Sequence, residues 1–208
     1  VTLIISKSGN TLETISNANI LMNKKENNIF ITENKKSYLR SLANKLKSEI
    51  INHNNFIGGR YSVLSEVGML PAELMGFSSN KFRRLNDLIK NKQFINHLIK
   101  GVLNILNLNN NNITNSIIIN YDKRSNDLFL WYQQLVAESL GKKNKGILPV
   151  ISSMPRDNHS LMQYYLDGIK NNFFTLFFVK EKDNKKINNK KVLEHYSDLK
   201  NKSLNDIS

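Results

Sequence analysis

The sequence predicts an α/β protein in which helices cover both faces of a parallel β-sheet, a three-layer α/β/α sandwich. Short apolar runs alternate along the chain with longer segments of helical periodicity, and this alternation is typical of a mostly parallel sheet. The 208 residues are 40% hydrophobic. That composition supports a real core, and the length allows one full domain or one and a part.

The predicted strands are short apolar segments, most of them rich in β-branched or aromatic residues. They lie at 1–5, 29–32, 116–120, 147–151 and 173–179. The segment 173–179 is the longest apolar run, and we expect it to form a buried strand. It is much shorter than the roughly 18 residues that a membrane helix needs, so we expect no membrane segment.

The predicted helices lie between these strands and carry apolar residues at helical spacing. They lie at 11–22, 36–47, 61–70, 82–91, 93–106, 125–141 and 159–166. The asparagine-rich segment 107–112 is predicted to be a polar loop or a species-specific insertion. From about residue 181 the sequence EKDNKKINNKK predicts an exposed tail.

Composition and charge exclude several classes of protein. The net charge of +13 would suit a nucleic-acid-binding protein, but the lysines are scattered and do not alternate with aromatic residues as a stacking platform requires. We therefore expect no nucleic-acid partner. The chain has no cysteine, which rules out disulfides and cysteine-based zinc sites. It opens on a strand without a methionine or signal peptide, so we expect a fragment of a longer protein.

The segment SKSGNT, between the first strand and the first helix, predicts an anion-binding turn. The unpaired N–H groups and the positive dipole at a helix start bind negative charge. Ser6, Ser8 and Thr11 can add hydroxyl donors and Lys7 a charge, while Gly9 lets the backbone approach a ligand closely. The spacing is not that of a P-loop. The alternative is an ordinary helix start, with Thr11 or Ser8 as N-cap and nothing bound.

Further along, FIGGRYSVLSEVGMLP places Gly58 and Gly59 before Arg60 and a helix. The glycines permit a turn that brings the backbone and Arg60 toward a ligand. A solvated arginine in an ordinary turn is the alternative.

The helix in DLFLWYQQLVAESLGKK carries a candidate base. Leu128, Trp131 and Leu135 form an apolar stripe that Glu138 continues, with Gln134 one turn earlier on a neighbouring face. A carboxylate on a buried stripe is costly unless it is paired or protonated, which suits a general base. Alternatively, the helix has left the core at that point and Glu138 is solvated.

In MPRDNHSLMQYYLDG we expect Asp157 or Asn158 to cap a helix and to place His159 in its first turn. There the histidine could accept or relay a proton. A structural role for this histidine is the alternative.

Together and in this order, these motifs resemble the glucose-6-phosphate isomerase family. GGRYSVLSEVGMLP and QQLVAESLGK match its two signatures, SKSGNTLET its phosphate turn and DNHSLMQ its histidine segment. The resemblance runs from residue 1 to about residue 180. It implies a pair of flavodoxin-like sugar-isomerase (SIS) domains, with residues 1–51 ending the first and 52–208 forming most of the second. A further phosphate loop and a ring-opening lysine would then lie outside this sequence.

The resemblance also assigns roles to residues. The phosphate contacts fall on Ser6, Lys7, Ser8 and Thr11, whereas Asn10 stands where the family usually has threonine.

The sugar contacts implied by the resemblance fall on Gly59, Arg60, Gln134, Glu138 and His159. Arg60 lies beside the enediolate, and Gln134 and Gly59 contact the substrate. Glu138 is the catalytic base. His159 opens the sugar ring and is contributed by the neighbouring subunit of a homodimer.

The implied activity is reversible isomerisation of glucose 6-phosphate and fructose 6-phosphate through a cis-enediol, a cytoplasmic step of glycolysis and gluconeogenesis. It needs no cofactor, and the sequence offers no ligand cluster for a metal. Two alternatives remain open. One is an isomerase that also accepts mannose 6-phosphate, and the other is a phosphosugar-binding SIS module without turnover.

Overall fold

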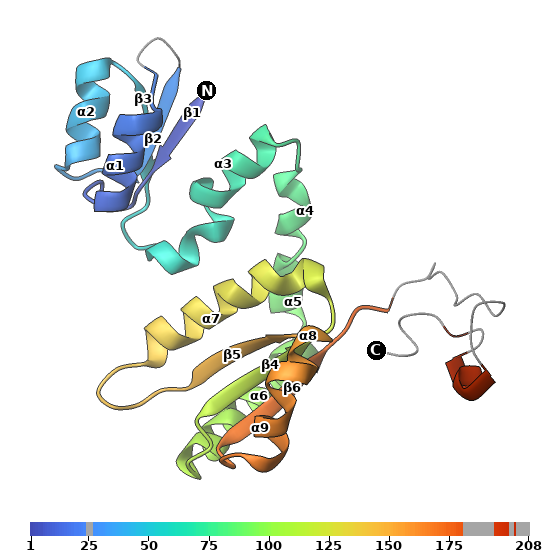
Figure 1. Ribbon diagram of the computed structural model, residues 1–208. Coiled ribbons are helices and arrows are strands. Elements are labelled where there is room, and N and C mark those ends of the chain that lie inside the picture. Colours follow the sequence, from blue (N-terminus) through green and yellow to red (C-terminus); the bar gives the residue numbers. More distant parts are fainter. Residues whose placement is uncertain (24–26, 181–193, 200–201, 203–208) are drawn as a thin grey trace. The chain divides into compact units, whose positions relative to one another are not determined.

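The computed structural model describes residues 1–23, 27–180, 194–199 and 202. The chain divides into two compact units, Val1–Asn96 and His97–Ser208, and each is described by itself (Figure 1). The expected SIS-domain boundary after residue 51 falls inside strand β3 (Glu49–His53), and the assignment of SIS domains stays a prediction. Of the predicted tail, residues 181–193, 200–201 and 203–208 lie outside the described residues, and Glu194–Leu199 forms a 3-10 helix with a kink at Tyr196.

The first unit contains a three-stranded parallel sheet with the order β1–β2–β3. Its elements begin with β1 (Thr2–Ile5), α1 (Leu12–Leu21), β2 (Asn28–Glu33), α2 (Tyr38–Leu46) and β3. A 3-10 helix (Gly59–Leu64), α3 (Glu66–Leu74), α4 (Ser79–Arg83) and α5 (Asn86–Lys90) follow.

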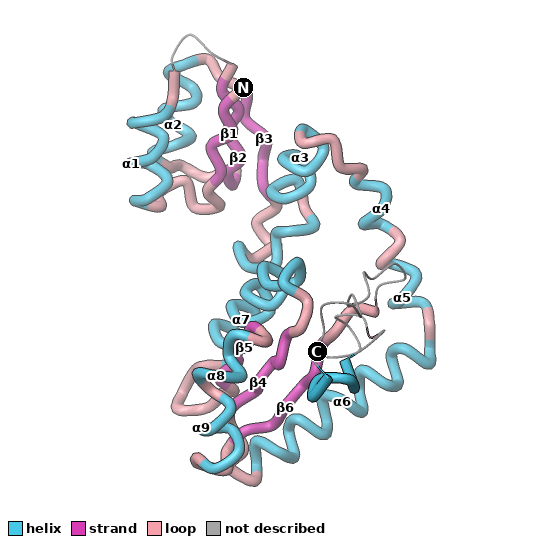
Figure 2. The backbone as a smooth tube through the Cα atoms, turned by 45° about the vertical axis from the view of Figure 1, so that its right-hand side comes forward, coloured by secondary structure: helices cyan, strands magenta, loops and turns pink. Residues whose placement is uncertain are grey.

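The core of the first unit lies between its sheet and the helices α1 and α2, which pack on the same face (Figure 2). Phe30 of the central strand β2 is fully buried and shares one cluster with Ala18 of α1 and Ala43 of α2. The two alanines let the helices approach the sheet closely. Successive side chains of a strand point to opposite faces, so Ile31, also fully buried, is covered on the other face.

The second unit contains another three-stranded parallel sheet, with the order β5–β4–β6. Its elements are β4 (Asn115–Asn120), a 3-10 turn (Lys123–Ser125), α7 (Asn126–Leu140), β5 (Leu148–Ser153), α8 (Arg156–Ser160), α9 (Met162–Asp167) and β6 (Asn172–Phe177). The helix α6 (Lys92–Asn110) contains the division between the units. Among the described residues, no helix has the length and apolar character needed to cross a membrane.

In the second unit α7 and α9 cover opposite faces of the sheet. Phe129 of α7 packs edge-on against Phe177 of β6, with ring centroids 4.9 Å apart. Tyr165 of α9 packs against Phe174 of the same strand, with centroids 5.5 Å apart. Phe174 and Phe177 are an odd number of positions apart, so their side chains lie on opposite faces. The predicted three-layer α/β/α fold with parallel strands is confirmed.

The structure corrects the sequence analysis at two strands, β3 and β6. The sequence reading missed β3, whose charged Glu49 and polar Asn52 interrupt its apolar pattern; an edge strand does not need a continuous apolar run. The expected burial of the strand at 173–179 is wrong. β6 occupies an edge of its sheet, and Leu176 is 66% exposed. The apolar run identified a strand, but its position in the sheet decided its burial.

Several helix boundaries also differ from the sequence prediction. The expected helix at 61–70 is a 3-10 helix followed by α3, that at 82–91 is the pair α4 and α5, and that at 159–166 is the pair α8 and α9. The loop predicted at 107–112 is wrong for its first part, because α6 continues to Asn110. Once a helix has formed, each added residue gains a backbone hydrogen bond, which outweighs the weak propensity of asparagine.

Candidate functional site

The turn between β1 and α1 closes on itself through its own hydroxyl groups. Ser6, which is buried, shares a hydrogen bond of 2.8 Å between its Oγ and the Oγ1 of Thr11. The backbone N–H of Gly9 donates to Ser6 Oγ at 3.2 Å. Ser8 Oγ accepts from the backbone N–H of Asn10, also at 3.2 Å. The hydroxyls predicted as phosphate donors are thus gathered in one turn.

Gly9 is required by the fold itself. Its φ is +65°, and a Cβ at this position would lie 2.2 Å from the Oγ of Ser37. The backbone N–H of Leu39 donates to the Gly9 carbonyl at 3.0 Å. Asn10, where the family usually has threonine, accepts from the backbone N–H of Tyr38 through its Oδ1 at 2.9 Å. Both residues therefore hold the start of α2 against the turn.

The start of α1 has open backbone donors. Thr11 occupies the N-cap position, but its side chain makes no cap hydrogen bond to the helix because its hydroxyl pairs with Ser6. In the part of the chain that the structure describes, no acceptor is found for the backbone N–H groups of Lys7, Ser8, Leu12, Glu13 and Thr14. An ordinary side-chain cap does not account for this helix start. The turn is open to an anion.

Lys7 points its ammonium group at other parts of the first unit. Its Nζ donates to the carbonyl of Asn55 at 3.0 Å and to that of Ile57 at 2.7 Å. It also lies 3.2 Å from Oε1 of Glu33, at the end of β2. The charge predicted to bind phosphate therefore has three oxygen neighbours within the protein.

The loop that contains Asn55 and Ile57 leads into the 3-10 helix, whose first residues are Gly59 and Arg60. The Arg60 guanidinium lies over the ring of Tyr61, 5.0 Å from its centroid, which fits a cation–π contact. Gly58 has φ of −65°, which any residue can adopt. A Cβ on Gly59 would meet no described atom within 4 Å. The space beside Gly59 is therefore open to a ligand.

His53 supports the same loop from the end of β3. It is almost fully buried, and its Nε2 lies 3.1 Å from the carbonyl oxygen of Ile57. Its Nδ1 pairs with the carboxylate of Glu66 in the first turn of α3. The sequence analysis did not single out His53 or Glu66. Glu66 lies within the segment FIGGRYSVLSEVGMLP, but its partner His53 is 13 residues away and outside that segment.

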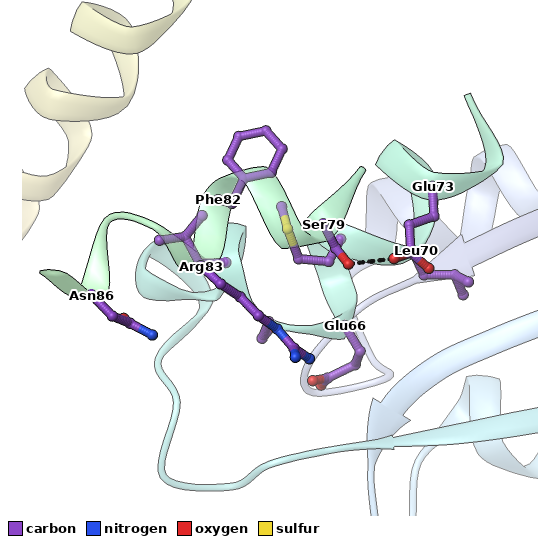
Figure 3. A pocket seen from close by; sticks show the side chains of 10 residues that line it. Glu66, Leu70, Glu73, Ser79, Phe82, Arg83 and Asn86 are labelled. Atoms are coloured by element: carbon purple, nitrogen blue, oxygen red, sulfur yellow. Dashed lines mark hydrogen bonds between the residues drawn. The ribbon is translucent and has the colours of Figure 1, made fainter. Parts of the chain in front are cut away.

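A hollow in the first unit lies between α3 and α4 (Figure 3). Charged and polar residues line it together with apolar ones: Glu66, Glu73, Ser79, Arg83 and Asn86, with Leu64, Ser65, Met69, Leu70 and Phe82. Ser79 donates a hydrogen bond to Glu73 (Figure 3). None of the predicted site residues lines this hollow.

On α7 the two consecutive glutamines, Gln133 and Gln134, face in different directions. Gln133 donates to the carbonyl of Pro149 on β5 at 2.7 Å and so faces the sheet. Gln134 is exposed and donates to Oε2 of Glu138 at 3.3 Å. The predicted neighbours Gln134 and Glu138 are thus in contact.

The buried stripe expected to lead to Glu138 is wrong. Phe129 and Gln133 make the sheet contacts, whereas Leu128 is 52% exposed. Glu138 is also exposed within this unit, as in the alternative of a solvated carboxylate. Leu128, Trp131 and Leu135 do have helical spacing, but more than one face of α7 carries apolar residues. The face that packs on the sheet is the neighbouring one with Phe129 and Gln133.

The prediction that Asp157 or Asn158 caps the helix that carries His159 is also wrong. The helix α8 begins one residue before Asp157, with Pro155 at the N-cap position. His159 lies in the last turn of this short helix and is exposed. His159 therefore does not lie at the start of a helix, as the sequence analysis expected.

Asp157 instead fastens α8 to the end of β5. It is 5% exposed, and its carboxylate accepts the backbone N–H of Ser153 at 2.7 Å and the Nε of Arg156 at 2.8 Å. The hydrogen bond from Arg156 holds the pKa of the Asp157 carboxyl below its ordinary value, aided by the Ser153 N–H and opposed by burial. Asp157 therefore fixes the segment that carries His159.

The helix α7 runs back to the start of β5, and α8 follows the end of β5 (Figure 1), so Glu138 and His159 belong to opposite ends of the sheet in the second unit. Glu138 is near the carboxyl end of α7, which leads back to the start of β5. His159 follows the far end of the same strand. Among the described residues, no group of three or more histidine, aspartate or glutamate side chains could hold a metal ion.

Comparisons with known proteins identify relatives. The family model described as phosphoglucose isomerase matches residues 1–148, which include the Glu138 signature and end before His159. The chain is 32% identical to glucose-6-phosphate isomerase of Methanocaldococcus jannaschii, over 94% of this chain and 53% of that protein. It is also 32% identical to glucose-6-phosphate isomerase of Mycoplasma capricolum, over 89% of this chain and 47% of that protein.

The chain thus spans about half the length of the relatives that it matches. The crystal structure of a hypothetical protein from Thermus thermophilus superposes with a TM-score of 0.81. It covers 99% of this chain and 54% of that one at 24% sequence identity, and this likeness supports the fold alone.

Proposed function

Because the chain belongs to the phosphoglucose isomerase family, we propose that its protein interconverts glucose 6-phosphate and fructose 6-phosphate. Relatives with the name glucose-6-phosphate isomerase support the reaction. The structural observation that carries the proposal is the turn at residues 6–11, whose hydroxyls and open backbone donors suit a phosphate. A role in glycolysis and gluconeogenesis follows from the reaction and would place the protein in the cytoplasm.

The phosphate of the sugar binds at the turn that contains Ser6, Lys7, Ser8 and Thr11, where Lys7 offers its open backbone N–H. The hydroxyls donate hydrogen bonds, and the backbone N–H groups of the turn and of the first turn of α1 add further donors. Hydrogen bonds to a charged group contribute roughly 1.5–3 kcal/mol each, so this turn supplies much of the ground-state affinity.

The chemistry needs a proton transfer between neighbouring carbons. The substrate arrives as a closed ring, and His159 helps to open it by acid–base catalysis. Glu138 then removes the proton from C2 and returns it to C1 through a cis-enediol. Arg60 stabilises the negative charge that develops on the enediolate oxygens. Gln134 orients Glu138 and the sugar, and Gly59 leaves space for the ligand.

His159 acts in the active site of a neighbouring subunit of a homodimer. The positions of Glu138 and His159 support this assignment, since one chain holds them at opposite ends of one sheet. In a dimer where His159 of each chain reaches the active site of the other, Glu138 and His159 act on the same substrate molecule.

An assay of the protein at its natural length tests the reaction. Glucose 6-phosphate, fructose 6-phosphate and mannose 6-phosphate are each offered, with product detected through a coupled dehydrogenase. We expect turnover of the first two in both directions. Comparable turnover of mannose 6-phosphate would indicate a broader isomerase. Tight binding of the sugar phosphates without turnover would establish the phosphosugar-binding alternative instead.

A further inference from the structure

The loop at residues 54–58 leads from β3 into the 3-10 helix that carries Gly59 and Arg60. Apart from Ile57 and Gly58, its residues are exposed, and Phe56 is 98% exposed, so little apolar packing holds it. Its carbonyl groups are held instead. Lys7 Nζ binds the carbonyls of Asn55 and Ile57 at 3.0 and 2.7 Å, across 48 and 50 residues of sequence.

The ammonium group of Lys7 has three protein oxygens as neighbours. An ammonium has three N–H donors and no acceptor. Two of these donors bind the loop carbonyls. Oε1 of Glu33 lies 3.2 Å from the same Nζ, and the Glu33 side chain is only 14% exposed. Glu33 also neutralises the charge. A phosphate that approached this ammonium would compete with these three oxygens.

A second anchor acts on the same loop. The buried imidazole of His53 contacts the Ile57 carbonyl through Nε2 and Glu66 of α3 through Nδ1. Arg60 lies in the sequence between Ile57 and Glu66. The segment that carries Arg60 is therefore held on both sides. Before Arg60, Lys7 and His53 bind the 54–58 loop, and after it His53 binds Glu66 of α3.

We infer that Lys7 is a positioning residue whose ammonium, neutralised by Glu33, fixes the 54–58 loop and through it Arg60, and that Lys7 does not bind the phosphate through its charge. The inference rests on the proposed function, because Arg60 is there the group that stabilises the enediolate. Displacing such a group by about 1 Å can lower a rate about 100-fold.

The primary test compares Lys7→Met with wild type in the protein at its natural length. Methionine keeps much of the side-chain length and removes the donors. We expect kcat to fall about tenfold or more, while the inhibition constant of inorganic phosphate changes less than about twofold. A phosphate ligand would behave in the opposite way. A tenfold rise in that inhibition constant with kcat unchanged would overturn the inference.

Two further variants separate the roles more sharply. Glu33→Gln leaves Lys7 its donors but removes the neutralising charge. We expect kcat to fall as in Lys7→Met, though by less, with phosphate inhibition unchanged. If Lys7 bound phosphate, freeing it from Glu33 would strengthen that inhibition. Lys35→Met removes an exposed positive charge nearby and should change neither quantity.

A double-mutant cycle with Arg60 shows whether Lys7 acts through it. In an Arg60→Met background, adding Lys7→Met should change kcat less than twofold, because the group that it positions is gone. Equal effects of Lys7→Met in both backgrounds would contradict the inference. Lys7→Arg, which keeps the charge and donors, should recover part of the lost rate, and circular dichroism checks that each variant folds. Absence of isomerase turnover in the wild type would instead refute the proposed function.

Discussion

Glu138 and His159 stand at opposite ends of one three-stranded parallel sheet, although each belongs to a motif of the same predicted active site. They are separated by the length of β5, whose six residues span about 20 Å at roughly 3.3 Å per residue. A general acid or base must be within hydrogen-bond reach of the proton it moves. This separation is the reason for our proposal that Glu138 and His159 of different chains act on one sugar molecule.

A hybrid dimer tests this arrangement. Glu138→Gln and His159→Ala chains, each with a different tag, are co-expressed and the mixed dimer is purified through both tags. If His159 serves the neighbouring subunit, one site of the hybrid has an intact Glu138 and an intact His159. We expect about half of the wild-type rate per dimer, while each mutant homodimer is far less active. A hybrid no more active than the two homodimers would mean that both residues serve a site in their own chain.

Glu138→Gln should abolish proton transfer and preserve binding. Glutamine keeps the size of the side chain but cannot act as a base, and general acid–base catalysis typically contributes about 10²–10⁴-fold. We expect kcat to fall by at least that order, with the inhibition constant of inorganic phosphate unchanged.

Hydrogen exchange separates Glu138 from His159. The His159→Ala enzyme should still exchange the C2 proton of open-chain substrate with solvent deuterium, because its task ends when the ring is open. The Glu138→Gln enzyme should not. Deuterium incorporation at the wild-type rate by Glu138→Gln would identify another residue as the base.

The phosphate turn predicts an effect of Thr11→Val on substrate affinity. The substitution keeps the shape of the side chain and removes the hydroxyl that meets Ser6 Oγ at 2.8 Å. Losing a hydrogen bond to a charged group of roughly 1.5–3 kcal/mol should raise KM about tenfold or more. The control is Thr14→Val, one turn along α1, which should leave KM within about twofold. Equal KM values for the two variants would remove Thr11 from the phosphate site.

Two glycines should respond differently to alanine. Gly9→Ala places a Cβ 2.2 Å from Ser37 Oγ at a φ of +65°, so it should lower the free energy of unfolding by about 1 kcal/mol or more. Gly59→Ala meets no described atom within 4 Å, so stability should hold or rise slightly. If the sugar occupies that space, Gly59→Ala should instead raise KM or lower kcat. Urea unfolding and steady-state kinetics on both variants measure the contrast, and unchanged kinetics in Gly59→Ala would remove Gly59 from the sugar site.

Local sequence was sufficient where neighbouring residues supply the signal. The apolar run before SKSGNT and the helical spacing after it predicted β1, the turn and α1. Alternating strand and helix signals predicted the parallel three-layer fold, because parallel strands need crossover helices. Motifs of matched spacing also indicated the family to which the chain belongs.

Tertiary structure alone decided the partners of these motifs, because those partners come from distant parts of the chain. Lys7 looked like a phosphate ligand by its neighbours in sequence, yet its ammonium meets carbonyls 48 and 50 residues away. Periodicity marked several apolar faces on α7, and only packing against β5 and β6 selected the face of Phe129 and Gln133. Strand order put the apolar β6 at an exposed edge. Sequence specifies local conformation through short-range sterics and periodicity, whereas burial and hydrogen-bond partners depend on contacts that exist only once the chain has folded.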